Sequence, residues 1–229
     1  MRYTALGDSI TAGSGASRPD RAYPARILEA SARTRSPAAR RPGLADCLAV
    51  LAEPGWTTAA LDAAVLEQDP LWLTRADAIS VWIGGDDLAA AGLALLRVPR
   101  SAIGQAAPRL IEAAIASHRR HLAHLLRHLR QTSRARLVVC TQYNPFPNSP
   151  LAAMAIAQLN QATRSVAAEF GAALAPADTW FAGREALLIR GYRTGRLEDV
   201  LTDPVLPVHP NDEGHRVIAR HLGPILGIQ

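Results

Sequence analysis

The chain has 229 residues, 48% of them hydrophobic, with 25 basic and 20 acidic side chains and a net charge of +5. This apolar content can fill a sizeable core and excludes a disordered chain. No linker rich in Gly, Ser or charge divides the sequence, so we expect one domain over residues 1–229. No uncharged apolar run reaches the roughly 18 residues of a membrane span.

Short apolar runs alternate along the chain with longer segments of helical pattern. The predicted strands are Arg2–Leu6, Cys47–Ala52, Ala78–Ile83, Leu137–Thr141 and Ala172–Ala175, and the predicted helices are Pro24–Arg35, Thr58–Gln68, Pro108–Arg130, Pro150–Phe170 and Asp212–Leu222. This alternation predicts parallel βαβ units. We therefore expect an α/β fold, a three-layer α/β/α sandwich with a flavodoxin-like five-stranded parallel sheet. Ligands of such sheets bind beyond the carboxyl ends of the strands.

The first predicted strand runs directly into Gly7-Asp8-Ser9-Ile10-Thr11. A serine at a tight turn between a strand and a helix presents its hydroxyl beside backbone N–H groups, but it needs a base within hydrogen-bond reach. A phosphate-binding loop at Gly13-Ser14-Gly15 is the rival interpretation. It lacks the third glycine of a dinucleotide fingerprint, because position 18 is arginine, and the chain has no lysine for a P-loop. The early strand also predicts a cytoplasmic protein with no signal peptide.

Glycine-containing turns follow the next two predicted strands. Gly55-Trp56-Thr57-Thr58 either brings a backbone N–H close to a ligand or is an ordinary turn. Gly84-Gly85-Asp86-Asp87 places paired acids at a strand end. The paired acids suit a polar site, a Mg²⁺ site, or a helix start at which the dipole favours acidic residues.

A histidine-containing block, His209-Pro210-Asn211-Asp212-Glu213-Gly214-His215, precedes the last predicted helix. His209 is a candidate proton acceptor, because imidazole titrates near neutral pH, and a loop histidine without a role is the alternative. Asn211 is the predicted N-cap of the helix, with Gly214 in place of a capping-box Glu.

Basic and sulfur-containing residues favour structural roles. A basic cluster holds Arg33, Arg35, Arg40 and Arg41 and no aromatic residue that would stack on bases, so we expect a solvated loop and no nucleic-acid partner. The two cysteines, Cys47 and Cys140, lie in separate apolar runs and are predicted to be buried, unpaired thiols.

Four histidines recur at helical spacing within one predicted helix, at His118, His121, His124 and His128. Arginines flank them and disfavour a bound cation, so we expect a polar outer face and no metal site. The segment after the fourth strand is a candidate substrate wall, with Tyr143, Asn144 and Phe146 facing the pocket, or a loop held by its prolines. Trp56 packs either beside an acyl group or in the core.

Together, the blocks at Gly7–Thr11, Gly55, Gly84–Asp87 and His209–His215 resemble the SGNH (GDSL-like) hydrolases in order and in content. The resemblance spans almost the whole chain. It implies Ser9 as the nucleophile and His209 as the general base, with the N–H groups of Ser9 and Gly55 as oxyanion-hole donors. It also implies a small-molecule ester substrate and no metal or organic cofactor.

Two positions depart from the family pattern. The family has an asparagine that donates to the oxyanion where this chain has Asp86, and an ionised carboxylate cannot donate a hydrogen bond. Our hypothesis is that Asp86 is protonated, or turns away and leaves two backbone donors. The family also has an aspartate three residues before the base, where this chain has Leu206. Either Asp203 or a backbone carbonyl then orients His209.

The resemblance implies a serine hydrolase that cleaves carboxylic esters, an esterase or lipase-like enzyme that forms an acyl-enzyme on Ser9. Family members act on lipid esters, thioesters and acetylated sugars, so the substrate stays open, as does the oligomeric state. The alternative is an SGNH-like binding protein in which these departures have abolished turnover. A flavodoxin-like module that binds a ligand or a phosphate is a third possibility.

Overall fold

The computed structural model describes residues 1–34, 47–202 and 205–228. Its sheet consists of β1 (Arg2–Gly7), β2 (Cys47–Ala52), β3 (Ala78–Trp82), β4 (Arg136–Cys140) and β5 (Ala173–Ala175). The strands are all parallel and lie in the order β2-β1-β3-β4-β5. The predicted flavodoxin-like five-stranded sheet is therefore confirmed, and four of its strands differ from the predicted bounds by one or two residues.

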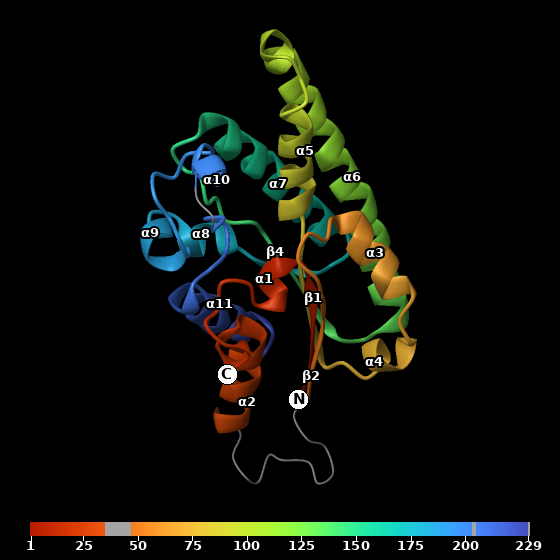
Figure 1. The fold of residues 1–229 in the computed structure, drawn as a ribbon. Helices are drawn as coiled ribbons and strands as arrows, with labels where there is room; N and C mark the ends of the chain where they lie inside the picture. Colours follow the sequence, from red (N-terminus) through yellow and green to blue (C-terminus); the bar gives the residue numbers. More distant parts are fainter. Residues whose placement is uncertain (35–46, 203–204, 229) are drawn as a thin grey trace.

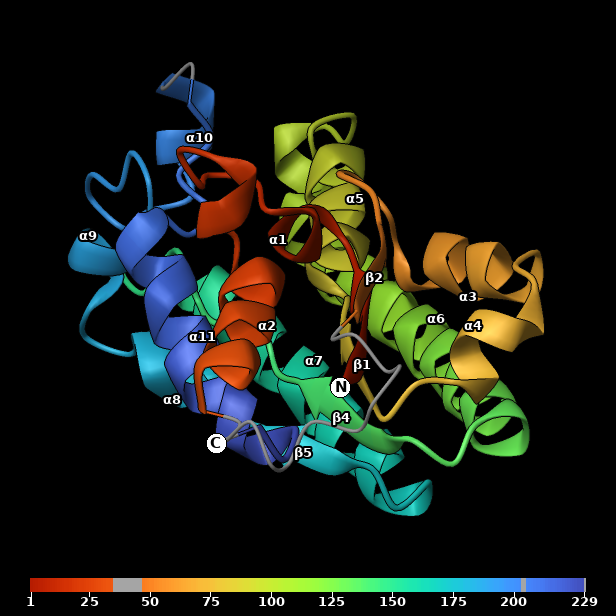
Figure 2. The same ribbon diagram turned by 90° about the horizontal axis from the view of Figure 1, so that it is seen from below.

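Helices cover both faces of the sheet (Figures 1 and 2). They are α1 (Ser9–Ala12), α2 (Tyr23–Thr34), α3 (Thr58–Leu66), α4 (Pro70–Thr74), α5 (Gly85–Leu95), α6 (Ile103–Thr132), α7 (Pro150–Glu169), α8 (Ala177–Phe181), α9 (Glu185–Leu188), α10 (Asp199–Thr202) and α11 (Asp212–Ile225), with 3₁₀ turns at Pro19–Arg21 and Arg100–Ala102. Helices α2, α8 and α11 pack on one face, whereas α3, α6 and α7 pack on the other. The predicted three-layer sandwich is thus the observed architecture.

Two helices differ from their predictions in an informative way. Helix α6 begins at Ile103, so Pro108 lies inside the helix and does not open it as predicted. The five residues before Pro108 are helical because α6 packs along α5, and this contact is invisible to local pattern. Helix α5 is missing from the predicted helices, although a helix start was one interpretation of Gly84–Asp87, and the structure has Asp86 and Asp87 in its first turn.

The strands divide their side chains between two apolar clusters. In β3, Ala78 and Trp82 join the cluster beneath α2 and α11, whereas Ile79 and Val81 join the cluster beneath α3, α6 and α7. Strand β4 alternates in the same way. This alternation follows from the two-residue period of a strand, and burial on both faces explains why the inner strands β3 and β4 are almost continuously apolar.

Of the four histidines of α6, His118 does not belong to the polar outer face that the sequence predicted, whereas His124 is exposed and His121 and His128 are half-buried. His118 is 0% exposed, and Asp62 of α3 accepts from the Nδ1 atoms of His121 and His124 at 3.0 and 2.8 Å. The prediction was wrong for His118 because it considered α6 alone, while α3 and α7 pack against this helix.

His118 belongs to a buried polar chain that crosses three helices. Its Nδ1 lies 2.7 Å from the Thr58 hydroxyl and its Nε2 lies 2.9 Å from the Thr163 hydroxyl. The Thr58 hydroxyl in turn donates to Asp87 at 2.9 Å. Gly84 has φ +121°, and a Cβ there would lie 2.9 Å from the His118 ring, so this close approach requires glycine. Burial lowers the pKa of His118 to about 4, which keeps the ring neutral.

The cysteine prediction is half right. Cys140 is buried in the core, whereas Cys47 is exposed, and both are free thiols. Cys47 is the first residue of β2, which is an edge strand of the sheet. No further strand of the described sheet lies beside β2, so the Cys47 side chain is left exposed. In the basic cluster, Arg33 pairs with Glu29, in line with a solvated surface, and residues 35–46 lie outside the described part of the chain.

We predict that neutral His118 makes the fold sensitive to acid. An unfolded histidine titrates near pH 6.5 and folded His118 near pH 4, so unfolding takes up a proton between these values. Stability from this group is present above pH 6.5 and is lost as the pH falls toward 4, by on the order of 3 kcal/mol. Urea unfolding of His118→Gln at several pH values should therefore show a shallower loss on acidification than the unchanged protein.

Thr163→Val is the matched control for that experiment. It removes a hydrogen bond of the same chain but keeps the titrating ring, so it should lower stability by about 1 kcal/mol or more at every pH with an unchanged slope. Equal slopes for His118→Gln and the unchanged protein would contradict a neutral, buried His118.

Candidate active site

Ser9 lies at the carboxyl end of β1, where the chain turns into α1. The Asp8 side chain caps this short helix by accepting from the Ile10 N–H at 3.0 Å, and Ser9 is the first helical residue. The first N–H groups of a helix have no partner within it and point out of its N-terminus. The Ser9 hydroxyl therefore lies beside unpaired backbone donors, as the sequence predicted for a strand-to-helix turn.

The structure brings His209 to Ser9. The distance from His209 Nε2 to Ser9 Oγ is 3.0 Å, although the residues are 200 positions apart. Two hydrogen bonds hold the main chain at His209. The His209 C=O accepts from the Arg190 N–H at 2.9 Å, and the C=O of the preceding Val208 accepts from the Tyr143 hydroxyl. A bridge between Ile189 and Pro210 extends this pairing.

The rest of the histidine block has structural roles. The Asn211 side chain accepts from the N–H groups of Glu213 and Gly214, so it caps α11 as predicted. His215 is 0% exposed, and its Nδ1 accepts from the Tyr23 N–H at 3.3 Å. The proton of this ring must then lie on Nε2, which donates to the Ser14 C=O at 3.1 Å. His215 thus ties the segment after α1 to α2 and α11.

The ring of His209 is partly buried and has a lowered pKa. Burial is the larger cause and the positive charge of Arg190 is the smaller one. Among the described residues, Ser9 is the one side-chain hydrogen-bond partner of this ring. Leu206 is 50% exposed and offers no acid, and Asp203 lies outside the described residues.

Gly55 and Asp86 lie together at the next strand ends. The backbone N–H of Gly55 donates toward the Asp86 carboxyl, yet the pKa of Asp86 is raised, because burial and the neighbouring Asp87 outweigh that hydrogen bond. Asp87 accepts from the N–H and the hydroxyl of Thr58 at 2.8 and 2.9 Å. These bonds fix the turn that carries Gly55 against the start of α5.

A third buried acid completes this region. Burial is the main cause that raises the pKa of Asp8 to about 8, and the charges of Asp86 and Asp87 raise it further. Asp8 therefore carries a proton at neutral pH. This limits the negative charge that accumulates behind the Ser9 backbone.

Two of the three residues predicted to form a substrate wall are buried in the core, and that prediction is wrong for them. Tyr143 stacks on Phe181 with ring centroids 4.1 Å apart, and Phe146 is buried as well. Asn144 is partly exposed, but its side chain accepts from the Phe146 N–H within its own loop. Trp56 packs against the α3–α6 side of the core. The aromatic residues turn inward because α8 covers this end of β4 and β5.

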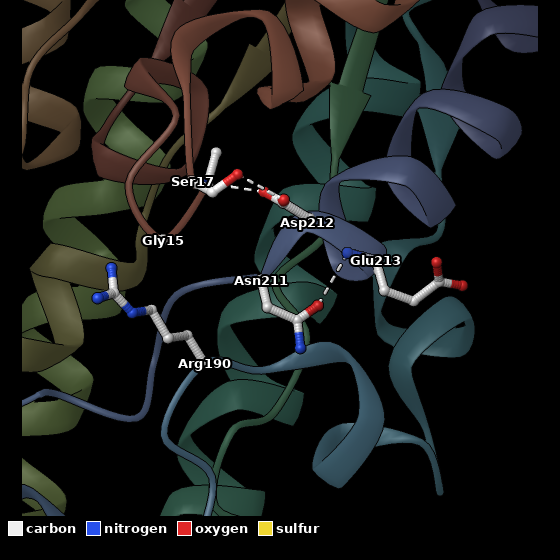
Figure 3. Close-up of a pocket in the computed structure, with 7 residues that line it drawn as sticks. Gly15, Ser17, Arg190, Asn211, Asp212 and Glu213 are labelled. Carbon is white, nitrogen blue, oxygen red and sulfur yellow. Dashed lines mark hydrogen bonds between the residues drawn. The ribbon is translucent and has the colours of Figure 1, made fainter.

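An open pocket adjoins the histidine loop, and the sequence did not predict it. It has a volume of about 710 Å³ and is lined by residues 15–17, Arg190 and residues 211–213 (Figure 3). Gly15 forms its boundary with His209, since a Cβ on Gly15 would lie 3.0 Å from the His209 Cβ. Arg190 carries no sequence signal in a chain so rich in arginine, and only the tertiary structure places it here.

Within the described ranges 1–34, 47–202 and 205–228, no group of three or more His, Cys, Asp or Glu side chains is arranged to hold a metal ion. Within the same ranges, no helix combines the length and the apolar character needed to cross a bilayer.

Comparison with known proteins points to one family. A sequence model described as the GDSL-like Lipase/Acylhydrolase family matches residues 5–217. None of the curated proteins is similar enough in sequence to match the chain.

Solved structures of similar fold include several hydrolases. The lipase Lip_vut3 from a goat rumen metagenome has a TM-score of 0.70 at 22% identity, over 97% of this chain and 96% of its own. Phospholipase A1 from Streptomyces albidoflavus NA297 has a TM-score of 0.69 at 21% identity, over 98% and 97%. A catalytic mutant of Axe2, an acetylxylan esterase from Geobacillus stearothermophilus, has a TM-score of 0.68 at 16% identity, over 99% and 94%. At these identities the likeness shows the fold.

We predict that His209 titrates below the ordinary histidine pKa of 6.5, because both burial and Arg190 disfavour its charged form. NMR titration of the ring from about pH 4 to pH 8 measures this directly. Arg190→Gln should raise the pKa of His209, whereas Arg136→Gln, at the amino end of β4, should leave it unchanged. A pKa above 6.5 would instead indicate an acid hydrogen-bonded to the ring.

Proposed function

Because this chain belongs to the GDSL-like Lipase/Acylhydrolase family and is an ester hydrolase, we propose that it cleaves carboxylic esters through an acyl-enzyme on Ser9, with His209 as general base. The observation that carries this proposal is the 3.0 Å distance between Ser9 Oγ and His209 Nε2. This geometry is what a serine needs to lose its proton as it attacks.

The first half of the reaction acylates Ser9. Ser9 Oγ bonds to the ester carbonyl carbon while its proton passes to His209 Nε2. The bond from that carbon to the alcohol oxygen then breaks, and the alcohol leaves with the proton from Nε2. The lowered pKa of His209 favours a neutral ring at the start of this cycle, so the base is available at neutral pH.

The second half releases the acid. Water gives a proton to His209 Nε2 and bonds to the acyl carbon. The bond from that carbon to Ser9 Oγ breaks, and Ser9 recovers the proton from Nε2. The products are a carboxylic acid and the free enzyme, so the cycle balances without a cofactor.

The oxyanion formed in both halves needs donors that are already in place. We assign these to the Ser9 N–H, the Gly55 N–H and a protonated Asp86. The raised pKa of Asp86 supports this assignment, since a protonated carboxyl donates a hydrogen bond and an ionised one does not. Because the Gly55 N–H donates toward Asp86 in the free protein, the proposal requires this N–H to transfer to the oxyanion when the substrate binds.

In our proposal, hydrogen bonds to the main chain set the orientation of His209. The Arg190 N–H and the Tyr143 hydroxyl hold the main chain at His209 and Val208, which supports a Ser-His dyad. Asp203 remains the alternative third member. A binding protein without turnover is the second candidate function, and no specific observation favours it.

We predict that Ser9→Ala and His209→Ala each lower kcat/KM for p-nitrophenyl acetate by at least about 1000-fold, since each removes a group on which the other depends. Ser101→Ala, on an exposed 3₁₀ turn, is the matched control with unchanged activity. Asp203→Asn should lower the rate far less than His209→Ala.

Three results would revise this mechanism. Equal losses in Asp203→Asn and His209→Ala would make Asp203 a full member of a triad. Stoichiometric labelling of Ser9 by a fluorophosphonate without turnover would indicate an active nucleophile in a site that deacylates poorly. Neither labelling nor turnover would favour the binding protein.

We also predict that Asp86→Asn changes the pH–rate profile. The proposed donor is lost as the pH rises through the raised pKa of Asp86, and asparagine donates at every pH. Above that pKa the variant should therefore be faster than the unchanged enzyme, by on the order of 100-fold. Asp69→Asn, a conservative change in an exposed helix cap, is the control. An unchanged rate and profile in Asp86→Asn would exclude Asp86 from the oxyanion hole.

A further inference from the structure

The pocket beside the histidine loop lies next to the reacting groups. Its wall at Gly15 touches His209, and its wall at Arg190 is hydrogen-bonded to the His209 C=O at 2.9 Å. Gly15 has φ +88°, and a Cβ there would lie 2.2 Å from the Pro210 C=O, so a larger residue would push the two walls apart. The pocket therefore adjoins the segment that carries the base, without His209 itself among its lining residues.

The acidic groups of this pocket are already engaged within its wall. Asp212 accepts from the N–H and the hydroxyl of Ser17 at 2.8 and 2.6 Å, as the dashed lines of Figure 3 show. Glu213 forms an ion pair with Arg216. Each carboxylate is therefore already occupied by a partner within the wall of the pocket.

The Arg190 side chain differs from these neighbours. Within the described part of the chain, its guanidinium makes no ion pair and no hydrogen bond to a side chain. Figure 3 shows it extending away from Asp212 and Glu213, on the side of the pocket near Gly15. Its charge still reaches the catalytic base, because it contributes to the lowered pKa of His209.

The wider surroundings of the pocket are positive. Arg26 and Arg21 lower the pKa of Asp212, and Arg216, Arg184 and Arg26 lower that of Glu213. The two acids are thus outnumbered by arginines, and Arg190 adds a further positive charge. A pocket of this kind attracts anions and holds them through a guanidinium, whose planar donors suit phosphate, sulfonate and carboxylate oxygens.

The chemistry of the base decides which part of the substrate reaches this pocket. His209 must pass its proton to the leaving alcohol, so the alcohol lies on the His209 side of the ester and the acyl group lies toward the oxyanion donors. We propose that Arg190 binds an anionic group on the alcohol part of the ester substrate. This inference rests on the proposed function, and it narrows the substrates to esters of alcohols that carry a phosphate, sulfonate or carboxylate group.

The test uses two soluble acetate esters that differ in charge on the alcohol. 4-Acetoxybenzenesulfonate has an anionic leaving group, and 4-acetoxybenzenesulfonamide has a neutral one of similar size. At about pH 8 the base is neutral in all variants, and low ionic strength avoids screening. We expect kcat/KM to be about tenfold higher for the sulfonate, mainly through KM, because the guanidinium binds the anion before reaction.

Arg190→Gln should remove this preference. It should lower the ratio of kcat/KM for the sulfonate to kcat/KM for the sulfonamide about tenfold. Arg190→Lys should restore part of the preference, since lysine keeps the charge without the planar donors. Arg136→Gln makes the same change in net charge at the amino end of β4 and should preserve the preference.

A second pair of esters tests the assignment to the alcohol side. p-Nitrophenyl hydrogen adipate carries its charge on the acyl group, and p-nitrophenyl methyl adipate is the neutral match. We expect Arg190→Gln to affect both alike. A selective loss for the acyl-charged ester would overturn the assignment to the alcohol side.

Binding without turnover separates this inference from the proposed function. Calorimetry with Ser9→Ala should detect 4-hydroxybenzenesulfonate, the released alcohol, and the Ser9→Ala, Arg190→Gln double variant should bind it about tenfold more weakly. Turnover that depends on Ser9, combined with equal rates for both acetates and no effect of Arg190→Gln, would overturn the anion site and leave the hydrolase intact. Loss of all turnover and of Ser9 labelling, with anion binding retained at Arg190, would overturn the hydrolase and leave the anion site.

Discussion

The hydrogen bond between Ser9 and His209 is the contact on which the site depends, and the parallel sheet makes it possible. Parallel strands direct their carboxyl ends to one edge, so the turn after β1 and the turns after β2 and β3 meet there. In this strand order the chain moves first to one side of β1 and then to the other, and Ser9 lies at that switch. Helix α11 packs against α2 on the same face, which brings the loop before it over Ser9.

Burial controls the charge of this region as much as specific partners do. It lowers the pKa of His118, His215 and His209, and it raises that of Asp8. Burial therefore favours the neutral form of each of these groups. The consequence for the proposed chemistry is a base without a proton and an environment with less negative charge where the oxyanion develops.

Arg190 takes part in both the proposed reaction and the proposed binding of an anionic substrate. Its backbone fixes the position of His209, and its side chain opens toward the adjoining pocket (Figure 3). A cation so near the base favours neutral imidazole, which suits proton abstraction, and it also offers an anion site on the side from which the alcohol leaves. In our proposal, the same residue acts on the reaction through its charge and on the choice of substrate through its donors.

The sequence by itself determined the fold class and four motifs, because alternating apolar runs, Ser9 in its turn block and His209 in its block are local patterns. It also determined that Asn211 caps α11, since capping depends on neighbouring residues. Only the tertiary structure decided that His118 is buried, that Tyr143 and Phe146 face the core, and that Arg190 borders the base. These outcomes depend on what a distant helix or loop covers, and hydrophobic periodicity along one segment carries no information about its neighbours in space.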